Sequence, residues 1–128
     1  MAQGPRLFRL NIEVGNLEAA ADFYGELLDQ AGRRQMGGRC YFDVGAVTLQ
    51  VVRTDPVQTL PKALYFAVGD LDAMHRRASA LGCLAQDRVH GMAAGEPVVR
   101  PWGERSFYAA DPWGNPLCFV EDGTIYAG

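Results

Sequence analysis

The sequence predicts an α+β protein built from two βαβββ modules, whose curved mixed sheets surround a central pocket. Three observations predict this fold. The chain has 128 residues, 48% of them hydrophobic and 21% charged, which is the composition of an ordinary globular domain. A strand followed by a helix occurs twice, and each copy leads into strand-like runs. We therefore expect a single domain, 1–128, made of one module at 1–58 and a second at 59–128.

Each module begins with a strand that turns into a helix. Apolar residues alternate along 8–14 and again along 64–68, a period of two that is typical of strands with one buried face. Asn16 and Asp70 then stand where a helix N-cap is expected, before apolar residues at helical spacing over 17–28 and 71–81. Gly32 and Gly82 are predicted to end the two helices in the left-handed conformation.

Each module ends in a predicted hairpin. In the first, strands at 39–43 and 47–53 are joined through 44–46. In the second, strands at 106–110 and 116–121 are joined through Asp111-Pro112-Trp113-Gly114, which has Asp, Pro and Gly where a type I turn favours them. A weaker strand is predicted before each hairpin, near 34–36 and 83–87. The segment 88–100 is either a loop over the pocket or a ragged strand.

Charge and cysteine content exclude several classes of function. The chain has 12 Lys and Arg against 15 Asp and Glu, a net charge of -3, which argues against a nucleic-acid partner. Residues 1–6 lack the apolar region of a secretory signal, and no stretch is long and apolar enough to span a membrane. The three cysteines have no metal-binding or disulfide spacing. We therefore expect a cytoplasmic protein with reduced thiols and no membrane contact.

The period of two also predicts which side chains face the pocket. Its walls are expected to be apolar with a few polar groups, as in most small-molecule sites. Arg9 matters most, because a charged side chain in an enclosed space needs a partner, either Glu13, another residue or an anionic ligand group. The aromatic residues offer flat faces for stacking, and Trp102 is predicted to lie beside the ligand. The predicted ligand-binding residues are Arg9, Asn11, Glu13, Tyr41, Gln50, Tyr65, Trp102, Phe107 and Cys118.

Two blocks of sequence carry a family resemblance that covers nearly the whole chain. The first is Val14-Gly15-Asn16-Leu17 leading to Phe23-Tyr24, and the second runs from Trp102-Gly103-Glu104-Arg105 to Asp111-Pro112-Trp113-Gly114-Asn115-Pro116. Together with the module plan they resemble the vicinal oxygen chelate superfamily, which includes glyoxalase I, extradiol dioxygenases and bleomycin-resistance proteins. The second block looks most like the bleomycin-resistance branch.

The resemblance also implies where a metal would bind. Metal-dependent members of the superfamily draw His, Glu or Gln ligands from the first and last strands of each module, and the matching positions here are Arg9, Gln50, Ala63 and Cys118. Arg9 and Ala63 offer a divalent cation no lone pair, so we expect no metal and no cofactor. Neither histidine of the chain lies on a predicted pocket face.

Two hypotheses of function remain. The first is a metal-independent binding protein that sequesters a planar or aromatic natural product or drug, as in antibiotic resistance. The second is an enzyme. It would be either a glyoxalase-like or dioxygenase-like metal enzyme whose ligands lie at positions other than those inferred above, or a metal-independent lyase or isomerase with Glu13 or Cys118 as the reacting group. We favour binding over catalysis because an acid–base pair is lacking. The resemblance implies a homodimer, and the sequence does not identify the ligand.

Overall fold

The computed structural model describes residues 4–128 of the chain. Met1, Ala2 and Gln3, which belong to the segment searched for a secretory signal, lie outside the described residues. The chain divides into two compact units, Met1–Thr59 and Leu60–Gly128. This boundary lies one residue beyond the one predicted between the modules.

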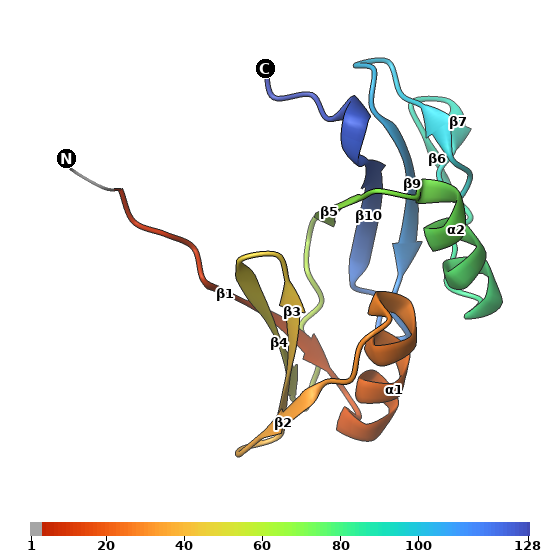
Figure 1. The fold of residues 1–128 in the computed structure, drawn as a ribbon. Helices are drawn as coiled ribbons and strands as arrows, with labels where there is room; N and C mark the ends of the chain where they lie inside the picture. Colours follow the sequence, from red (N-terminus) through yellow and green to blue (C-terminus); the bar gives the residue numbers. More distant parts are fainter. Residues whose placement is uncertain (1–3) are drawn as a thin grey trace. The chain divides into compact units, whose positions relative to one another are not determined.

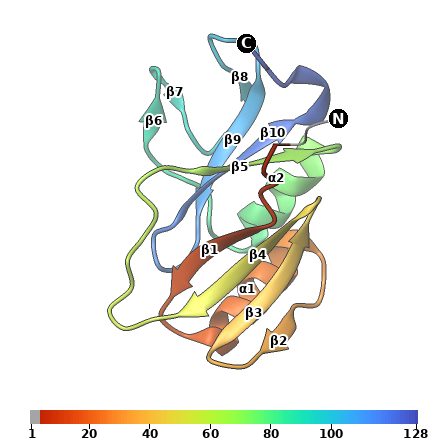
Figure 2. The same ribbon diagram turned by 90° about the vertical axis from the view of Figure 1, so that its left-hand side faces the viewer.

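The first unit is a four-stranded sheet with one helix. Its elements in chain order are β1 (Arg9–Val14), α1 (Leu17–Leu28), β2 (Arg33–Gln35), β3 (Arg39–Val44) and β4 (Val47–Arg53). The strands lie in the order β1-β4-β3-β2, with β1 parallel to β4 and the other pairs antiparallel. Figure 2 shows these four strands in front of α1, so that the helix covers one face of the sheet.

The second unit repeats this plan. Its elements are β5 (Leu64–Val68), α2 (Leu71–Ala80), β6 (Arg88–Val89), β7 (Met92–Ala93), β8 (Val98–Val99), β9 (Arg105–Ala110), β10 (Pro116–Glu121) and the 3-10 helix η1 (Asp122–Thr124). The main sheet has the order β5-β10-β9-β8, again with a parallel pair at the first strand (Figure 2). Figure 1 shows α2 beside this sheet. The predicted α+β fold of two βαβββ-like modules with mixed sheets is therefore confirmed.

Alternation along the strands separates a buried face from an open one. On β1, Ile12 and Val14 are fully buried, whereas Arg9 and Asn11 are exposed. The buried side chains pack with those of β3, β4 and α1, including Tyr24 and the other residues of the first core, Ala20, Phe23, Leu27, Cys40, Phe42, Leu49 and Val51. The core of the second unit contains Leu71, Met74, Ala78, Phe107, Leu117 and Phe119. Each helix thus covers one face of its own sheet and leaves the other face without a helix.

The predicted N-caps are confirmed, and one predicted C-cap is wrong. The side chains of Asn16 and Asp70 accept hydrogen bonds from backbone N–H groups three residues on, at 2.9 and 3.0 Å. Gly82 has the expected positive φ of 67°, but α1 ends earlier, at Asp29 with φ 53°. Gly32 has a different role, because a Cβ atom there would lie 2.7 Å from Cζ of Phe42. Its small size lets the chain pass close to β3.

The segment between α2 and β9 differs most from prediction. The segment expected to form a strand near 83–87 pairs with β9 only at residues 83–85: a bridge joins Leu84 to Ala109, and backbone hydrogen bonds of 3.0 and 2.9 Å join Ala85 to Tyr108 and Cys83 to Ala110. β8 pairs with the first residues of β9 and forms the outer strand there. β6 and β7 form a short separate hairpin, so the segment 88–100 contains ragged strands.

Two further expectations concern membrane-spanning helices and the state of the cysteines. None of the helices within residues 4–128 combines the length and the apolar character needed to cross a bilayer. Cys40, Cys83 and Cys118 are all free thiols and all buried.

Candidate functional site

The face of the first sheet opposite α1, called the first open face below, gathers five of the predicted site residues. Arg9, Asn11 and Glu13 come from β1, Gln50 from β4 and Tyr41 from β3. The strand register places Asn11 opposite Gln50 and Gln50 opposite Tyr41, in one row across three strands. The expectation that these side chains share a face follows from the period of two along each strand.

Arg9 lies against two aromatic rings on this face. Its guanidinium carbon stands 5.1 Å from the ring centroid of Phe8 and 5.3 Å from that of Tyr41, both within the range of a cation–π contact. Among the described residues, no carboxylate pairs with Arg9. The nearest acidic register neighbour across β4 is Asp43, which already binds Arg33 through two hydrogen bonds of 2.7 and 2.9 Å. The charge of Arg9 is thus held in place by rings and remains available to an anion.

The neighbours of Arg9 on β1 are held by protein contacts. The Nε2 atom of Gln50 donates a hydrogen bond of 2.5 Å to Oδ1 of Asn11. Glu13 accepts hydrogen bonds from Oγ1 of Thr54 at 2.9 Å and from the backbone N–H of Gln58 at 3.0 Å. Glu13 therefore fastens the segment that follows β4, a role that the sequence did not predict.

The face of the second sheet opposite α2, called the second open face below, carries a pair of phenols and a thiol. The register of β10 places Cys118 opposite Tyr65 on β5 and opposite Tyr108 on β9. The hydroxyls of Tyr65 and Tyr108 lie 3.2 Å apart, and their rings meet edge to face. Burial, and then the hydrogen bond to Tyr65, raises the pKa of Tyr108 well above its usual value. Tyr108 was not among the predicted site residues.

The thiol of Cys118 is a poor nucleophile in this setting. Burial raises its pKa to about 11, against the opposing effects of hydrogen bonds from Ser106 and Tyr108 and of the charge of Arg100. A neutral thiol is much less reactive than a thiolate. The structure therefore gives Cys118 the environment of a core residue that also borders a polar cluster.

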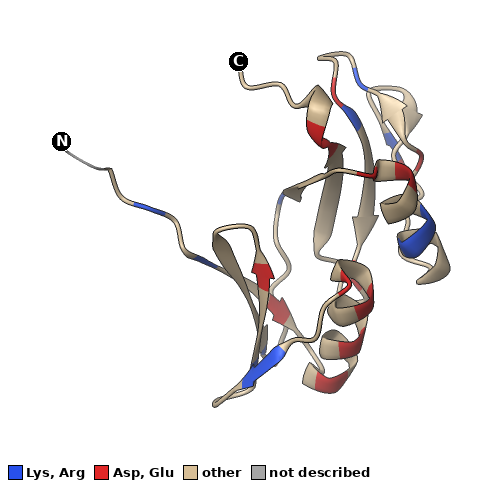
Figure 3. Cartoon of the chain, viewed as in Figure 1, with Lys and Arg blue, Asp and Glu red and all other residues tan. Residues whose placement is uncertain are grey.

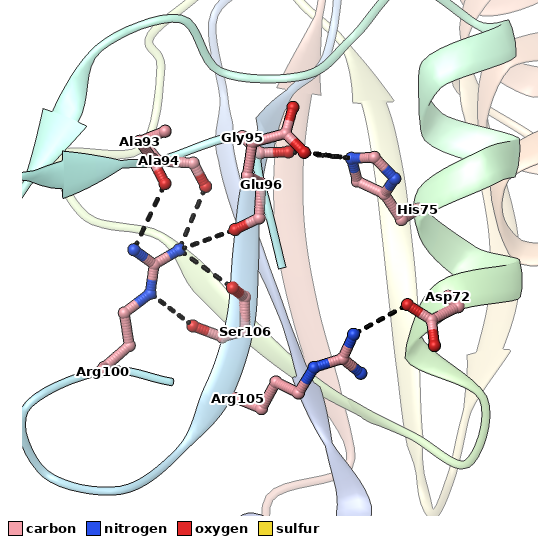
Figure 4. Close-up of polar contacts among 9 residues, drawn as sticks. All are labelled: Asp72, His75, Ala93, Ala94, Gly95, Glu96, Arg100, Arg105 and Ser106. Atoms are coloured by element: carbon pink, nitrogen blue, oxygen red, sulfur yellow. Dashed lines mark hydrogen bonds and ion pairs between the residues drawn. The ribbon is translucent and has the colours of Figure 1, made fainter. Parts of the chain in front are cut away.

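Arg100 is the unexpected member of this cluster. It is the largest fully buried side chain of the described chain, 2% exposed. Figure 4 shows its guanidinium surrounded by oxygen atoms: Nε donates to Oγ of Ser106 at 3.0 Å, and the terminal nitrogens donate to the carbonyls of Ala93, Ala94, Glu96 and Ser106 at 2.9–3.4 Å. Its guanidinium carbon also stands 5.3 Å from the ring centroid of Tyr108.

All these partners of Arg100 are neutral, in contrast to those of Arg105. Arg105 forms ion pairs of 2.8 Å with Asp72 on α2 and with Glu121 on β10, and it lowers the pKa of Asp72 through a hydrogen bond. Figure 4 shows Arg105 reaching towards α2 while Arg100 lies in the 93–106 segment. Arg105 is thus a structural ion pair, whereas the buried charge of Arg100 has no carboxylate partner among residues 4–128.

The structure separates the last two predicted site residues from the others. Phe107 is fully buried on the helix side of the second sheet, where its ring stacks on Phe119 and meets His75 of α2 edge to face. Trp102 lies in the turn before β9, with its ring against His90 and its Nε1 donating to Glu104 at 2.7 Å. Neither residue contacts Tyr65 or Cys118 among the described contacts.

The donors on the open faces do not fit a metal ion. No group of three or more His, Cys, Asp or Glu side chains in the described part of the chain is close enough to bind one. Of the four positions implied by the resemblance, Arg9 carries a positive charge, Ala63 has no donor and Gln50 is engaged with Asn11. A divalent cation needs several oxygen, nitrogen or thiolate donors in one place.

Comparison with known proteins identifies the family. A model of the glyoxalase-like domain matches residues 9–120. Oxidase ChaP-H1 has a similar structure, with a TM-score of 0.78 and 23% identity over 98% of this chain and 100% of that one. A bleomycin resistance determinant encoded on the transposon Tn5 has a TM-score of 0.71 and 17% identity, with coverages of 92% and 98%.

A glyoxalase/bleomycin resistance protein from Albidiferax ferrireducens T118 has a TM-score of 0.68 and 22% identity over 90% of this chain and 98% of that one. No curated protein sequence matches the chain. The neighbours include an oxidase and a resistance determinant on the same fold, so the fold alone does not choose between catalysis and binding. The solved structures share the fold, and the family match over residues 9–120 shows that the protein belongs to the glyoxalase-like domain family.

Proposed function

We propose that the protein is a metal-independent binding protein that sequesters a small planar organic molecule bearing an acidic group. The observation that carries the proposal is the position of Arg9 on the first open face. Its guanidinium rests against Phe8 and Tyr41, and no carboxylate of the described chain neutralises it. Guanidinium groups bind carboxylates through two parallel N–H donors, and aromatic side chains stack on flat ligands.

The remaining features of the site favour binding over chemistry. Glu13, one of the two reacting groups considered for the enzyme hypothesis, has its carboxylate hydrogen-bonded to Thr54 and Gln58. Cys118 is buried and has a raised pKa, so a thiolate nucleophile is disfavoured at neutral pH. The similar fold of a bleomycin resistance determinant supports a sequestering role. We also propose a cytoplasmic homodimer, in keeping with the resemblance, and Trp102 as a further ligand contact.

The proposal is tested with a matched pair of flat probes, 1-naphthoate and its neutral amide 1-naphthamide. We expect calorimetry to show that the acid binds more tightly. Arg9→Gln should weaken the acid about tenfold and leave the amide nearly unchanged, because a charge-assisted hydrogen bond is lost. Tyr41→Leu should weaken both probes by roughly threefold to tenfold, because both lose a stacking face.

Arg76→Gln is the control, since it removes the same charge from an exposed position on α2. The proposal fails if neither probe binds at millimolar concentration, or if Arg9→Gln and Arg76→Gln weaken the acid equally. Turnover of a 2-oxo aldehyde–thiol adduct by the purified protein would favour the enzyme hypothesis instead.

A further inference from the structure

We propose that Tyr65 and Tyr108 form a second subsite, within the second unit, which donates a hydrogen bond to the anionic oxygen of a small organic ligand, a phenolate or a carboxylate, near the buried charge of Arg100. The inference rests on the proposed function and adds a recognition element that lies wholly within the second unit. It draws on the geometry of the second open face, and neither Arg100 nor Tyr108 was expected there from the sequence.

Arg100 places a buried positive charge beneath the second sheet's polar cluster. A guanidinium stays protonated at any pH that the fold tolerates, and a buried charge in proteins is normally paired with an opposite one. Arg100 is 2% exposed and has only carbonyl oxygens and a serine hydroxyl as hydrogen-bond partners. These dipoles solvate the guanidinium but leave its net charge in place. The second open face therefore lies near a positive charge that no carboxylate of the described chain contacts directly.

The charge of Arg100 acts on the phenol pair through Tyr108. The ring of Tyr108 lies between Arg100 and the phenol pair, since it contacts the guanidinium at 5.3 Å and its hydroxyl lies 3.2 Å from that of Tyr65. Glu104 acts in the opposite sense, but its two carboxylate oxygens accept hydrogen bonds from Nε1 of Trp102 and from the backbone N–H of Tyr126. Glu96, equally near in the chain, lies 3.8 Å from Nε2 of His75, so neither carboxylate is a direct partner of Arg100.

The hydroxyl protons of Tyr65 and Tyr108 decide whether the pair can donate to a ligand. Each phenol has one O–H donor, and one of the two protons lies between the paired oxygens. The neutral thiol of Cys118 can donate to Tyr108, so that Tyr108 donates to Tyr65 and the proton of Tyr65 is free for another acceptor. Tyr65 is 60% exposed, so a ligand can reach it. Tyr108 stays a neutral donor at physiological pH because burial raises its pKa.

These three features together select an oxyanion. A ligand oxygen that accepts from Tyr65 extends a chain of hydrogen bonds through Tyr108, and such chains strengthen one another in a site of low dielectric constant. An anionic acceptor gains more than a neutral one, because charge-assisted hydrogen bonds are about twice as strong. We therefore expect this subsite to distinguish phenolate from phenol.

The probe is 4-nitrophenol, which ionises near neutral pH and changes colour when it does, so the pKa of the bound probe can be read directly by absorbance. We expect the wild-type protein to bind the phenolate about tenfold more tightly than the phenol, which lowers the pKa of the bound probe by about one unit. Tyr65→Phe and Tyr108→Phe should each abolish most of this shift. Tyr126→Phe, a conservative change at an exposed tyrosine near the C-terminus, should leave it unchanged.

Arg100→Met should also abolish the shift, but Arg100 holds the 93–106 segment together, so Tyr65→Phe provides the test that does not disturb the core. If the probe binds with an unshifted pKa, or if the shift survives both Tyr65→Phe and Tyr108→Phe, the inference is wrong while the proposed function stands. If 1-naphthoate binds and 4-nitrophenol does not, the inference is likewise wrong. If neither compound binds, the proposed function itself fails.

Discussion

Replacing Phe107 with Ala tests whether this residue is a core or a ligand residue. The sequence placed Phe107 at the pocket, whereas the structure buries it completely between α2 and the sheet, with ring centroids 5.3 Å from Phe119 and 5.1 Å from His75. Removing a fully buried phenyl ring loses its transfer free energy and leaves a cavity, which together lower the free energy of unfolding by about 3–5 kcal/mol. That is a large share of the roughly 5–15 kcal/mol that stabilises a typical domain.

Urea unfolding followed by circular dichroism measures this loss. With a slope of about 2 kcal/mol per molar urea, the midpoint of Phe107→Ala should fall by about 2 M. Tyr65→Ala is the control, since it removes an aromatic ring from the same sheet but from a position that is 60% exposed, and it should lower the free energy of unfolding by less than about 1 kcal/mol. An unchanged midpoint for Phe107→Ala, together with weaker binding of 1-naphthoate, would contradict the core assignment.

Three further predictions concern pH, metal and assembly. Burial raises the pKa of both Cys83 and Cys118 to about 11 from 9.0, so the thiols lose their protons at lower pH in the unfolded chain than in the folded one. Their contribution to the free energy of unfolding should therefore be complete below pH 9 and be lost as the pH rises towards 11. Cys118→Ala should reduce the slope of the urea midpoint against pH. Incubation with EDTA should leave the melting temperature unchanged, and elemental analysis should find less than one equivalent of nickel, zinc, iron or manganese per chain; a stoichiometric metal lost together with stability would overturn the metal-free proposal. Sedimentation equilibrium should give the mass of two chains, and a monomer at micromolar concentration would refute the proposed homodimer.

Local signals in the sequence were sufficient to predict the repeated architecture. Asn16 and Asp70 are short polar residues at the start of amphipathic segments, and both cap a helix as expected. The alternation along residues 8–14 correctly assigned Ile12 and Val14 to the buried face and Arg9 and Asn11 to the open one. These features depend on neighbours in the chain, which is why a single sequence reveals them.

Features that depend on distant parts of the chain were missed. The segment near 83–87 pairs with β9 only at residues 83–85, and its partners lie far along the chain, whereas β8 lies just before β9 and pairs with its first residues. The position of Tyr108 on the open face could have been predicted from the sequence. Once Cys118 was placed on the open face and the hairpin joined 110 to 116, the antiparallel register put Tyr108 opposite Cys118. Arg100 gave no such signal, since it lies in the irregular part of the second unit.

The distribution of charge explains how a chain with a net charge of -3 can favour an anionic ligand. Acidic residues gather along α1, as Figure 3 shows, among them Glu18, Asp22 and Glu26. Arg9 lies on the face of the sheet opposite α1. The acidic side chains on the outer side of α1 are therefore separated from Arg9 by the sheet and by the helix, which is about 10 Å in diameter. At physiological salt, charges are screened over about 8 Å, so a small anion on the open face responds to Arg9 more than to the acids behind the sheet. A polyanion such as nucleic acid extends past this range and meets the acidic surface as well. The net charge that argues against a nucleic-acid partner is therefore compatible with the small organic acid proposed to bind at Arg9.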